Sequence, residues 1–301
     1  YQFIQPLGQG SSGAYYLAAT PPRLGIAAEH VAVKVLQVAA GDEAFHRLTR
    51  ELRTFAKVRS AHLVTLYDAG QEAGQCYYAM EYLPLGSLAH PAREVTRDGA
   101  IRAVACAARA AHDLHEAGMA HRDIKPANVL LTEDGAKLSD LGLVQILAPG
   151  QTITGLGAIG SVEYLDPAIM RGERASRSSD IWALGVTLHR VLTGHGVYGD
   201  LPDRDPLLAV RRVLSSPPTL DPGLSEAEAA IVRAPEISVA STALARAAAR
   251  EPELARWWER YLSLGPAALP GRRFPEVTLA APLAGYRLLA KYDLLALDPD
   301  G

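Results

Sequence analysis

The chain has 301 residues, of which 49% are hydrophobic, so it can bury the core of one large domain or of two smaller ones. Its formal net charge of −3 gives no basic signature for non-specific nucleic-acid binding. Two cysteines, Cys76 and Cys106, lie in unrelated contexts, which argues against a disulfide framework or a cysteine zinc site and favours a cytoplasmic location. The longest apolar stretch, residues 103–111, is too short to span a bilayer, and no signal peptide is visible, so we expect no membrane segment.

The first ninety residues are mostly typical of β-strands. "YQFIQPLGQG" and "AYYLAAT" flank a glycine turn, and "HVAVKVLQV" has ordinary strand length and composition. Two more strands are predicted in "HLVTLYDAG" and "QCYYAMEYL". A helix is predicted in "EAFHRLTRELRTFAKV", because Phe45, Leu48, Leu52 and Phe55 recur on one helical face.

After Ser87 the pattern changes to helices. Residues 98–118 are alanine-rich and amphipathic, and residues 179–193 form a second apolar helical segment. "LSSPPTLDPGLS", residues 214–225, is a break rich in proline and serine. Strands followed by helices predict an α+β fold with two lobes.

Three glycines near the N-terminus, Gly8, Gly10 and Gly13, form the pattern G-x-G-x-x-G. The pattern lies between two predicted strands, which argues against a dinucleotide-binding fold and favours a flap whose backbone N–H groups cover phosphates. A plain hairpin turn is the alternative.

Lys34 follows in "VAVK", where a buried lysine needs a partner such as Glu51 on the next helix. The alternative for Lys34 is a strand edge with its amine in solvent.

The stretch "HRDIKPANVLL" places an acid, a lysine and an amide within six residues of one another. Asp123 can accept a proton from an attacking hydroxyl group, and Lys125 can neutralise charge on a transferred phosphoryl group. Asn128 and the later Asp140, in "LSDLGL", offer the oxygen ligands that Mg²⁺ requires. A loop cap is the alternative for one such Asp, but not for the whole ordered set.

These motifs, together with "DLG" and "SDIWALG" at residues 179–185, make residues 1 to about 234 resemble the eukaryotic-type protein kinase family, in its bacterial Ser/Thr branch. The resemblance implies a bilobal protein-kinase-like fold, with a β-rich N-lobe at 1–86 and a helical C-lobe at 87–234. It implies ATP with Mg²⁺, or with Mn²⁺ in its place, as cofactors, and a protein hydroxyl as the acceptor in bacterial signalling.

The resemblance also implies a role for each motif residue. Asp123 would be the catalytic base, assisted by Lys125, whose "DIKP" context is similar to that of kinases acting on serine or threonine. Lys34 would hold the α- and β-phosphates and pair with Glu51, while Asn128 and Asp140 would bind the metal. The remaining ATP-binding residues would be the loop glycines and the segment "MEYL": Gly8, Gly10, Gly13, Met80, Glu81 and Leu83.

Regulation is indicated by Arg122, which precedes the predicted base and resembles the arginine that pairs with a phosphorylated activation segment. Thr152 and Thr154 are the candidate phosphorylation sites, with ordinary loop threonines as the alternative. Two residues depart from the family pattern. Tyr15 stands where valine is usual and would narrow the nucleotide pocket, and Ala168 replaces the glutamate that ends the pattern in "YLDPA".

Residues 235–301 are predicted to form a partial C-terminal domain. "GYRLLAKYDLLAL" resembles the start of a PD-(D/E)XK nuclease core of the RecB-like branch, which would make Asp293 a metal ligand and would make this segment the route to nucleic acid. The alternative is a small α+β accessory domain with Asp293 in a salt bridge.

The function predicted from the sequence is a Ser/Thr protein kinase that phosphorylates protein hydroxyls and itself. Three rival functions stay open. A nucleotide-binding pseudokinase scaffold is suggested by Tyr15 and Ala168, and a kinase module that regulates a fused nuclease is suggested by the tail. The third rival is an antibiotic phosphotransferase, which would have a related fold, although the glycine loop and "DIKPAN" argue against it. The sequence does not determine the oligomeric state.

Overall fold

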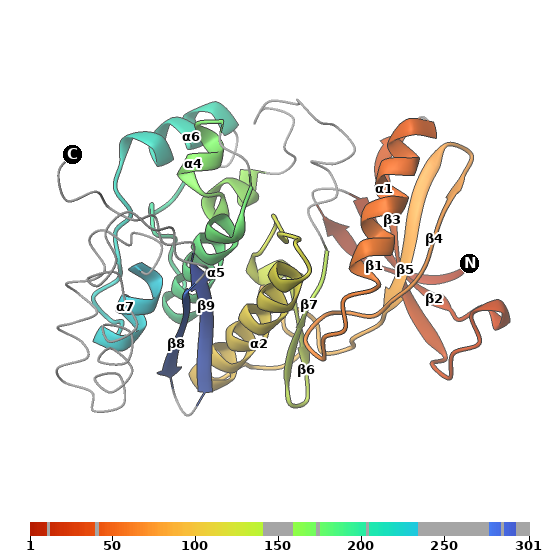
Figure 1. The fold of residues 1–301 in the computed structure, drawn as a ribbon, viewed down its shortest axis with the longest axis horizontal. Coiled ribbons are helices and arrows are strands. Elements are labelled where there is room, and N and C mark those ends of the chain that lie inside the picture. The colour runs from red at the N-terminus through yellow and green to blue at the C-terminus, as the bar shows by residue number, and fades with distance from the viewer. Residues whose placement is uncertain are drawn as a thin grey trace.

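The computed structural model describes residues 1–10, 13–39, 42–140, 159–172, 175–202, 205–233, 277–283 and 286–292. Figure 1 shows a β-rich lobe built from the N-terminal part of the chain and a mainly helical lobe beside it. The predicted α+β fold with two lobes is confirmed. Among the described residues, no helix is both long and apolar enough to cross a membrane.

The N-terminal lobe is one antiparallel five-stranded sheet with the order β1-β2-β3-β5-β4. Its elements are β1 (Gln2–Gly10), β2 (Gly13–Ala19), a 3₁₀ turn (Pro22–Leu24), β3 (His30–Ala39), α1 (Asp42–Phe55), β4 (Leu66–Glu72) and β5 (Gln75–Glu81). Helix α1 buries Leu48, Leu52 and Phe55 in the core, as its spacing predicts, and Phe45 packs against that core.

The glycine hairpin between β1 and β2 needs a residue without a side chain at its inner end. A Cβ atom on Gly13 would lie 2.1 Å from the carbonyl oxygen of Val35 on β3, closer than any side chain allows. Gly13 therefore lets the start of β2 lie close to β3. Gly10 pairs with Gly13, so the two strands of the hairpin stay paired up to this end of the sheet.

The strand register aligns three long side chains in one row across the sheet. Tyr15 on β2 is opposite Lys34 on β3, and Lys34 is opposite Tyr78 on β5. Residues directly opposite one another in neighbouring strands point to the same face of a sheet. The row Tyr15–Lys34–Tyr78 therefore faces the second lobe as a unit.

The C-terminal lobe is organised around two long helices, α2 and α5, which pack together. Its elements are α2 (Arg97–Glu116), a 3₁₀ turn (Pro126–Asn128), β6 (Val129–Thr132), β7 (Gly135–Leu138), a 3₁₀ helix (Ile159–Tyr164), α4 (Pro167–Met170), α5 (Arg177–Thr193), α6 (Pro206–Ser215) and α7 (Glu226–Arg233). The side chain of Thr96 caps α2 by accepting from the backbone N–H of Gly99, and Gly194 ends α5 in the left-handed conformation.

The tail contributes one described hairpin, β8 (Val277–Leu283) and β9 (Tyr286–Tyr292), whose strands are antiparallel. In Figure 1 this hairpin lies beside α5 and α2, and β9 contacts both helices. The boundary predicted at residue 235 lies outside the described residues, as do Thr152, Thr154 and Asp293.

An ion pair joins the first residue of α2, Arg97, to a buried carboxylate on α7, that of Glu228. The Arg97 guanidinium donates two hydrogen bonds to the Glu228 carboxylate, at 3.0 and 2.7 Å, and the backbone N–H of Ser225 donates a third at 2.7 Å. Burial raises the pKa of Glu228, but the hydrogen bonds from Arg97 and Ser225 outweigh it and hold the pKa below its usual value. The ionised form of Glu228 therefore stabilises the packing of α7 on α2.

We expect Arg97→Met to lower the free energy of unfolding by about 1–3 kcal/mol at pH 7, because it leaves the Glu228 carboxylate short of two donors. A carboxyl whose pKa is depressed by folding stabilises the protein above its unfolded pKa of about 4.3 and loses that effect as pH falls through its folded pKa. The deficit should therefore stay constant from pH 7 to pH 5 and shrink in more acidic buffer. Urea denaturation across this range measures it.

Arg93→Met is the matched control, since the Arg93–Glu133 ion pair is exposed on both sides. We expect it to change the free energy of unfolding by less than about 1 kcal/mol. Equal effects of the two substitutions would contradict the role given to Glu228.

Candidate active site

A cleft of about 950 Å³ separates the two lobes, and it collects most of the residues that the sequence singles out. Gly8, Gly10, Tyr15 and Lys34 line it from the first lobe. The segment that connects the lobes, from the end of β5 to Leu83, contributes Met80, Glu81 and Leu83. The second lobe contributes Asp123, Lys125, Asn128 and Asp140. Gly13 and Glu51 are not among the lining residues.

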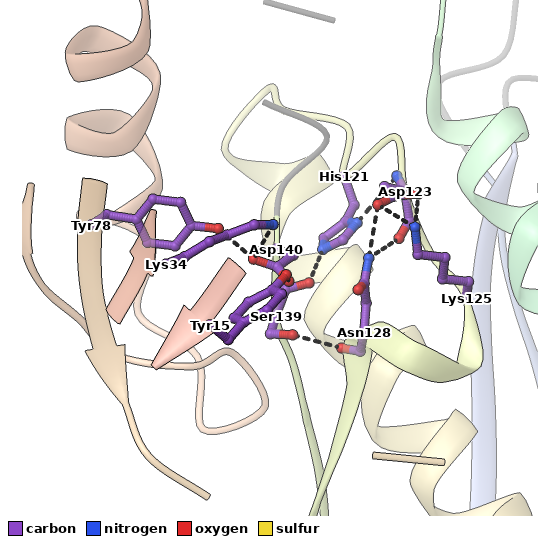
Figure 2. Close-up of polar contacts among 9 residues, drawn as sticks. All are labelled: Tyr15, Lys34, Tyr78, His121, Asp123, Lys125, Asn128, Ser139 and Asp140. Atoms are coloured by element: carbon purple, nitrogen blue, oxygen red, sulfur yellow. Dashed lines mark hydrogen bonds and ion pairs between the residues drawn. The ribbon is translucent and has the colours of Figure 1, made fainter. Parts of the chain in front are cut away.

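Lys34 and Asp140 form a buried ion pair across the cleft (Figure 2), with 3.1 Å between the lysine Nζ and the Asp140 Oδ1. Lys34 is 3% exposed and Asp140 is 7% exposed, so neither charge is solvated by bulk water. Among the described residues, no ion pair joins Lys34 to Glu51, the partner that the sequence predicts. In this conformation the lysine is committed to Asp140 instead.

Two tyrosine hydroxyls also contact Asp140, and no sequence motif indicated either contact. Tyr15 donates to one carboxylate oxygen and Tyr78 donates to the other (Figure 2). The Lys34 Nζ also lies over both rings, 4.7 Å from the centroid of Tyr15 and 5.9 Å from that of Tyr78. The cross-strand register, rather than any motif, would have been the signal for this cluster.

The charge of Asp140 is stable in this setting. Burial raises its pKa, but the Lys34 ammonium and the two tyrosine hydroxyls outweigh burial, so the pKa lies below its usual value. Asp140 is therefore an anion at neutral pH. Its backbone has a φ of 59°, the left-handed region, which is a strained conformation for a residue other than glycine.

The loop after α2 gathers the other predicted catalytic residues. The Lys125 Nζ lies 2.9 Å from each carboxylate oxygen of Asp123. The Asn128 side-chain amide donates to the Asp123 carbonyl at 2.7 Å and to its carboxylate at 2.9 Å (Figure 2). The Asp123 side chain keeps 29% of its surface exposed, so a substrate hydroxyl group can reach it from the cleft.

Asp180, on the buried face of α5, holds this loop in place. Its carboxylate accepts from the backbone N–H groups of His121 at 2.7 Å and of Arg122 at 2.8 Å, and His115 Nε2 lies 2.8 Å away. Arg122 has a φ of 72°, another strained backbone position. The two bonds that Asp180 accepts stabilise the loop at Arg122 and at the residue before it.

A chain of hydrogen bonds runs from this loop to Ser139, the residue before Asp140. His121 Nε2 lies 3.0 Å from the carbonyl of Ser139, and Ser139 donates its N–H and its hydroxyl to the carbonyl of Asn128. Burial lowers the pKa of His121, so the ring is neutral at neutral pH. The position of Asp140 is thereby fixed relative to Asp123 and Asn128.

Asn128 and Asp140 suit a divalent cation such as Mg²⁺. Both are buried, both offer oxygen, and the Asn128 amide nitrogen is used by Asp123, which leaves the amide oxygen for a ligand. The described residues contain no group of three or more His, Cys, Asp or Glu side chains that could hold a metal. Such a two-residue site fits a metal that takes its other ligands from water and phosphate.

The connecting segment is braced by its own ion pair. Lys137 on β7 lies 2.7 Å from both carboxylate oxygens of Glu81, which also accepts from the backbone N–H of Thr65 at 3.2 Å. The Glu81 side chain is therefore occupied, and only its backbone can serve a ligand. Met80 is buried behind it, at the back of the cleft.

The five-stranded lobe, the helical lobe and the polar cluster between them define the class of protein-kinase-like folds. A family model described as "Protein kinase domain" matches residues 1–223, and the chain belongs to that family.

Bacterial relatives agree with this assignment. The chain is 34% identical over 212 residues to the serine/threonine-protein kinase PknB of Mycolicibacterium smegmatis, which covers 64% of this chain and 34% of the relative. It is 31% identical over 241 residues to the DNA damage-responsive serine/threonine-protein kinase RqkA of Deinococcus radiodurans, with 77% and 36% covered. The chain thus spans about a third of the length of these curated relatives.

The fold is also similar to a solved structure. The crystal structure of the PknI kinase domain of Mycobacterium tuberculosis, a cysteine-to-alanine mutant, superposes with a TM-score of 0.56 at 25% sequence identity. The match covers 78% of this chain and 86% of that domain.

We expect Asp180→Asn to lower the free energy of unfolding by about 3–5 kcal/mol, because the amide turns one of its atoms from acceptor to donor and leaves a buried backbone N–H unpaired. Chemical denaturation measures the change. Asp200→Asn, at an exposed carboxylate, is the control and should stay within about 0.5 kcal/mol. A mild effect of Asp180→Asn would show that other contacts hold the loop.

Proposed function

We propose that this chain is the catalytic part of a Ser/Thr protein kinase, transferring the γ-phosphoryl group of ATP to protein hydroxyl groups and to itself. The observation that carries the proposal is the arrangement of Asp123, Lys125 and Asn128 in one hydrogen-bonded group. It faces the same cleft as the Lys34–Asp140 pair. A base, a phosphate-binding cation and metal ligands in one cleft are the parts that phosphoryl transfer needs.

In the proposed reaction Asp123 orients the acceptor hydroxyl group and takes its proton, while Lys125, 2.9 Å from Asp123, neutralises charge on the transferred group. Asn128 and Asp140 would hold Mg²⁺, or Mn²⁺ in its place, which supplies charge neutralisation on the phosphates when bound. The glycine loop would cover the phosphates. The adenine would bind to the backbone of Glu81 and Leu83 in front of Met80.

Lys34 would exchange its bond to Asp140 for the α- and β-phosphates when a nucleotide binds. Its predicted pairing with Glu51 belongs to that loaded form, since in the described conformation Lys34 contacts Asp140. The pseudokinase scaffold is the alternative. It is favoured by the occupied state of Asp140, whose two oxygens both accept hydrogen bonds from tyrosines.

We expect Asp123→Asn to reduce phosphate transfer from ATP to a generic protein substrate by about 10²- to 10⁴-fold, with nucleotide affinity nearly unchanged, because only the proton acceptor is removed. Radiolabel transfer and calorimetric titration with ADP and Mg²⁺ measure the two quantities. The control Asp134→Asn changes an exposed acid in the turn after β6 and should retain full activity. Undiminished transfer by Asp123→Asn would rule out the proposed base, and nucleotide binding without transfer in wild type would establish the pseudokinase.

The proposed regulatory sites give a separate test. With ATP and Mg²⁺, we expect autophosphorylation at Thr152 or Thr154, detected by mass spectrometry, and we expect the doubly substituted Thr152→Ala/Thr154→Ala protein to lose at least about tenfold in activity. The negative charge of the phosphate would pair with Arg122. Label confined to other residues, or full activity of the double variant, would contradict this assignment.

The interpretation of residues 235–301 as a nuclease-like segment stays a prediction, and with it the role of Asp293, the link to nucleic acid and the regulated-nuclease alternative. The family model stops at residue 223, before this segment. A cytoplasmic location also stays a prediction.

A further inference from the structure

Tyr15 lies in the space that a metal-bound nucleotide needs. Its hydroxyl bonds to Asp140, its ring lies 4.7 Å from the Lys34 Nζ, and a Cβ atom on Gly10 would be only 3.0 Å from the ring edge. The phenol therefore fills the gap between the glycine loop, the cation and the carboxylate. These are the three groups assigned above to the phosphates and the metal.

The side chains of Tyr15 and Tyr78 differ in how easily they can move away from Asp140. Tyr78 is 2% exposed, belongs to the core, and does not line the cleft. Tyr15 is half-buried and lines the cleft, beneath a hairpin with glycine at the position that touches its ring. Only Tyr15 can swing out without disrupting the sheet.

The two tyrosines also bond to different oxygens of Asp140. Tyr78 and Lys34 share Oδ1, whereas Tyr15 is the one described residue that bonds to Oδ2. Loss of the Tyr15 bond therefore frees one carboxylate oxygen for a cation, while Tyr78 continues to hold the other. The Tyr15–Asp140 contact can therefore be exchanged for a ligand, whereas the Tyr78–Asp140 contact stays in place.

We propose that Tyr15 is an internal competitor for the metal–phosphate subsite, displaced by Mg²⁺–nucleotide, and that Tyr78 is a positioning residue that keeps Asp140 in place. The inference rests on the proposed function, because it assumes that the cleft binds nucleotide. It predicts that one hydroxyl group and one ring lower the affinity of the free protein for Mg²⁺–nucleotide.

The test is calorimetric titration of the full chain with ADP, in Mg²⁺ and in EDTA. Tyr15→Phe removes the hydroxyl group but keeps the ring over Lys34, so we expect it to tighten binding of Mg²⁺–ADP on the order of three- to tenfold, the worth of one hydrogen bond. Binding in EDTA should change less than twofold. Tyr15→Val removes the ring as well and should tighten binding under both conditions.

Tyr16→Phe is the matched control. It is the next residue on β2, its side chain points to the opposite face, and its ring stacks on Phe3 at 4.7 Å. It should leave ADP binding unchanged. Tyr78→Phe should weaken Mg²⁺–ADP binding at least threefold with little change in EDTA, a metal-dependent loss that a merely structural defect would not show.

A second readout is thermal unfolding, measured without nucleotide and with Mg²⁺–ADP. Because Tyr15 stabilises the free protein through Asp140, Tyr15→Phe should lower the thermal midpoint of the free protein while raising the shift that Mg²⁺–ADP produces. Wild-type binding that Tyr15→Phe leaves unchanged or weakens would overturn the inference alone. Failure of wild type and of Tyr15→Val to bind ADP at all would overturn the proposed function and the inference together.

Discussion

The buried carboxylate of Asp140 is the group on which the arrangement of the two lobes depends. A buried anion is costly unless it is paired, and breaking such a pair costs about 3–5 kcal/mol. Its compensation comes from the first lobe, through Lys34 on β3 and the hydroxyls of Tyr15 and Tyr78 on the flanking strands. The contacts of this side chain therefore help to hold the sheet over the loop that carries Asp123.

The second lobe also contains a buried carboxylate that holds surrounding groups in place, that of Asp180. This carboxylate accepts hydrogen bonds from two backbone N–H groups of the loop that carries Asp123. His121 in turn contacts the carbonyl of Ser139, the residue before Asp140. The loop side of the cleft is thus held by hydrogen bonds at His121, Arg122 and Asn128. The sheet side holds the exchangeable contact, because Tyr15 lies at the cleft surface beneath a glycine hairpin. Movement on ligand binding is expected there rather than in the loop.

The departures from the family pattern have different structural consequences. Ala168 lies in the short helix α4, which Asp166 caps, and the described part of the C-lobe is tied together elsewhere, by Arg97 and Glu228. Tyr15 changes the site itself, since a valine could reach neither Asp140 nor the Lys34 ammonium. A single substitution near the start of β2 therefore links Lys34, Asp140 and the glycine hairpin in one cluster.

The sequence by itself determined the two-lobed α+β fold, the buried face of α1 and the family, because these depend on local periodicity and on motifs that are continuous in the chain. It also singled out Asp123, Lys125, Asn128 and Asp140. Only the tertiary structure decided the partner of Lys34 and the row Tyr15–Lys34–Tyr78, because strand register aligns residues that are distant in sequence. A motif identifies which residues are suited to a chemistry, but the packing of strands and lobes determines which of them meet.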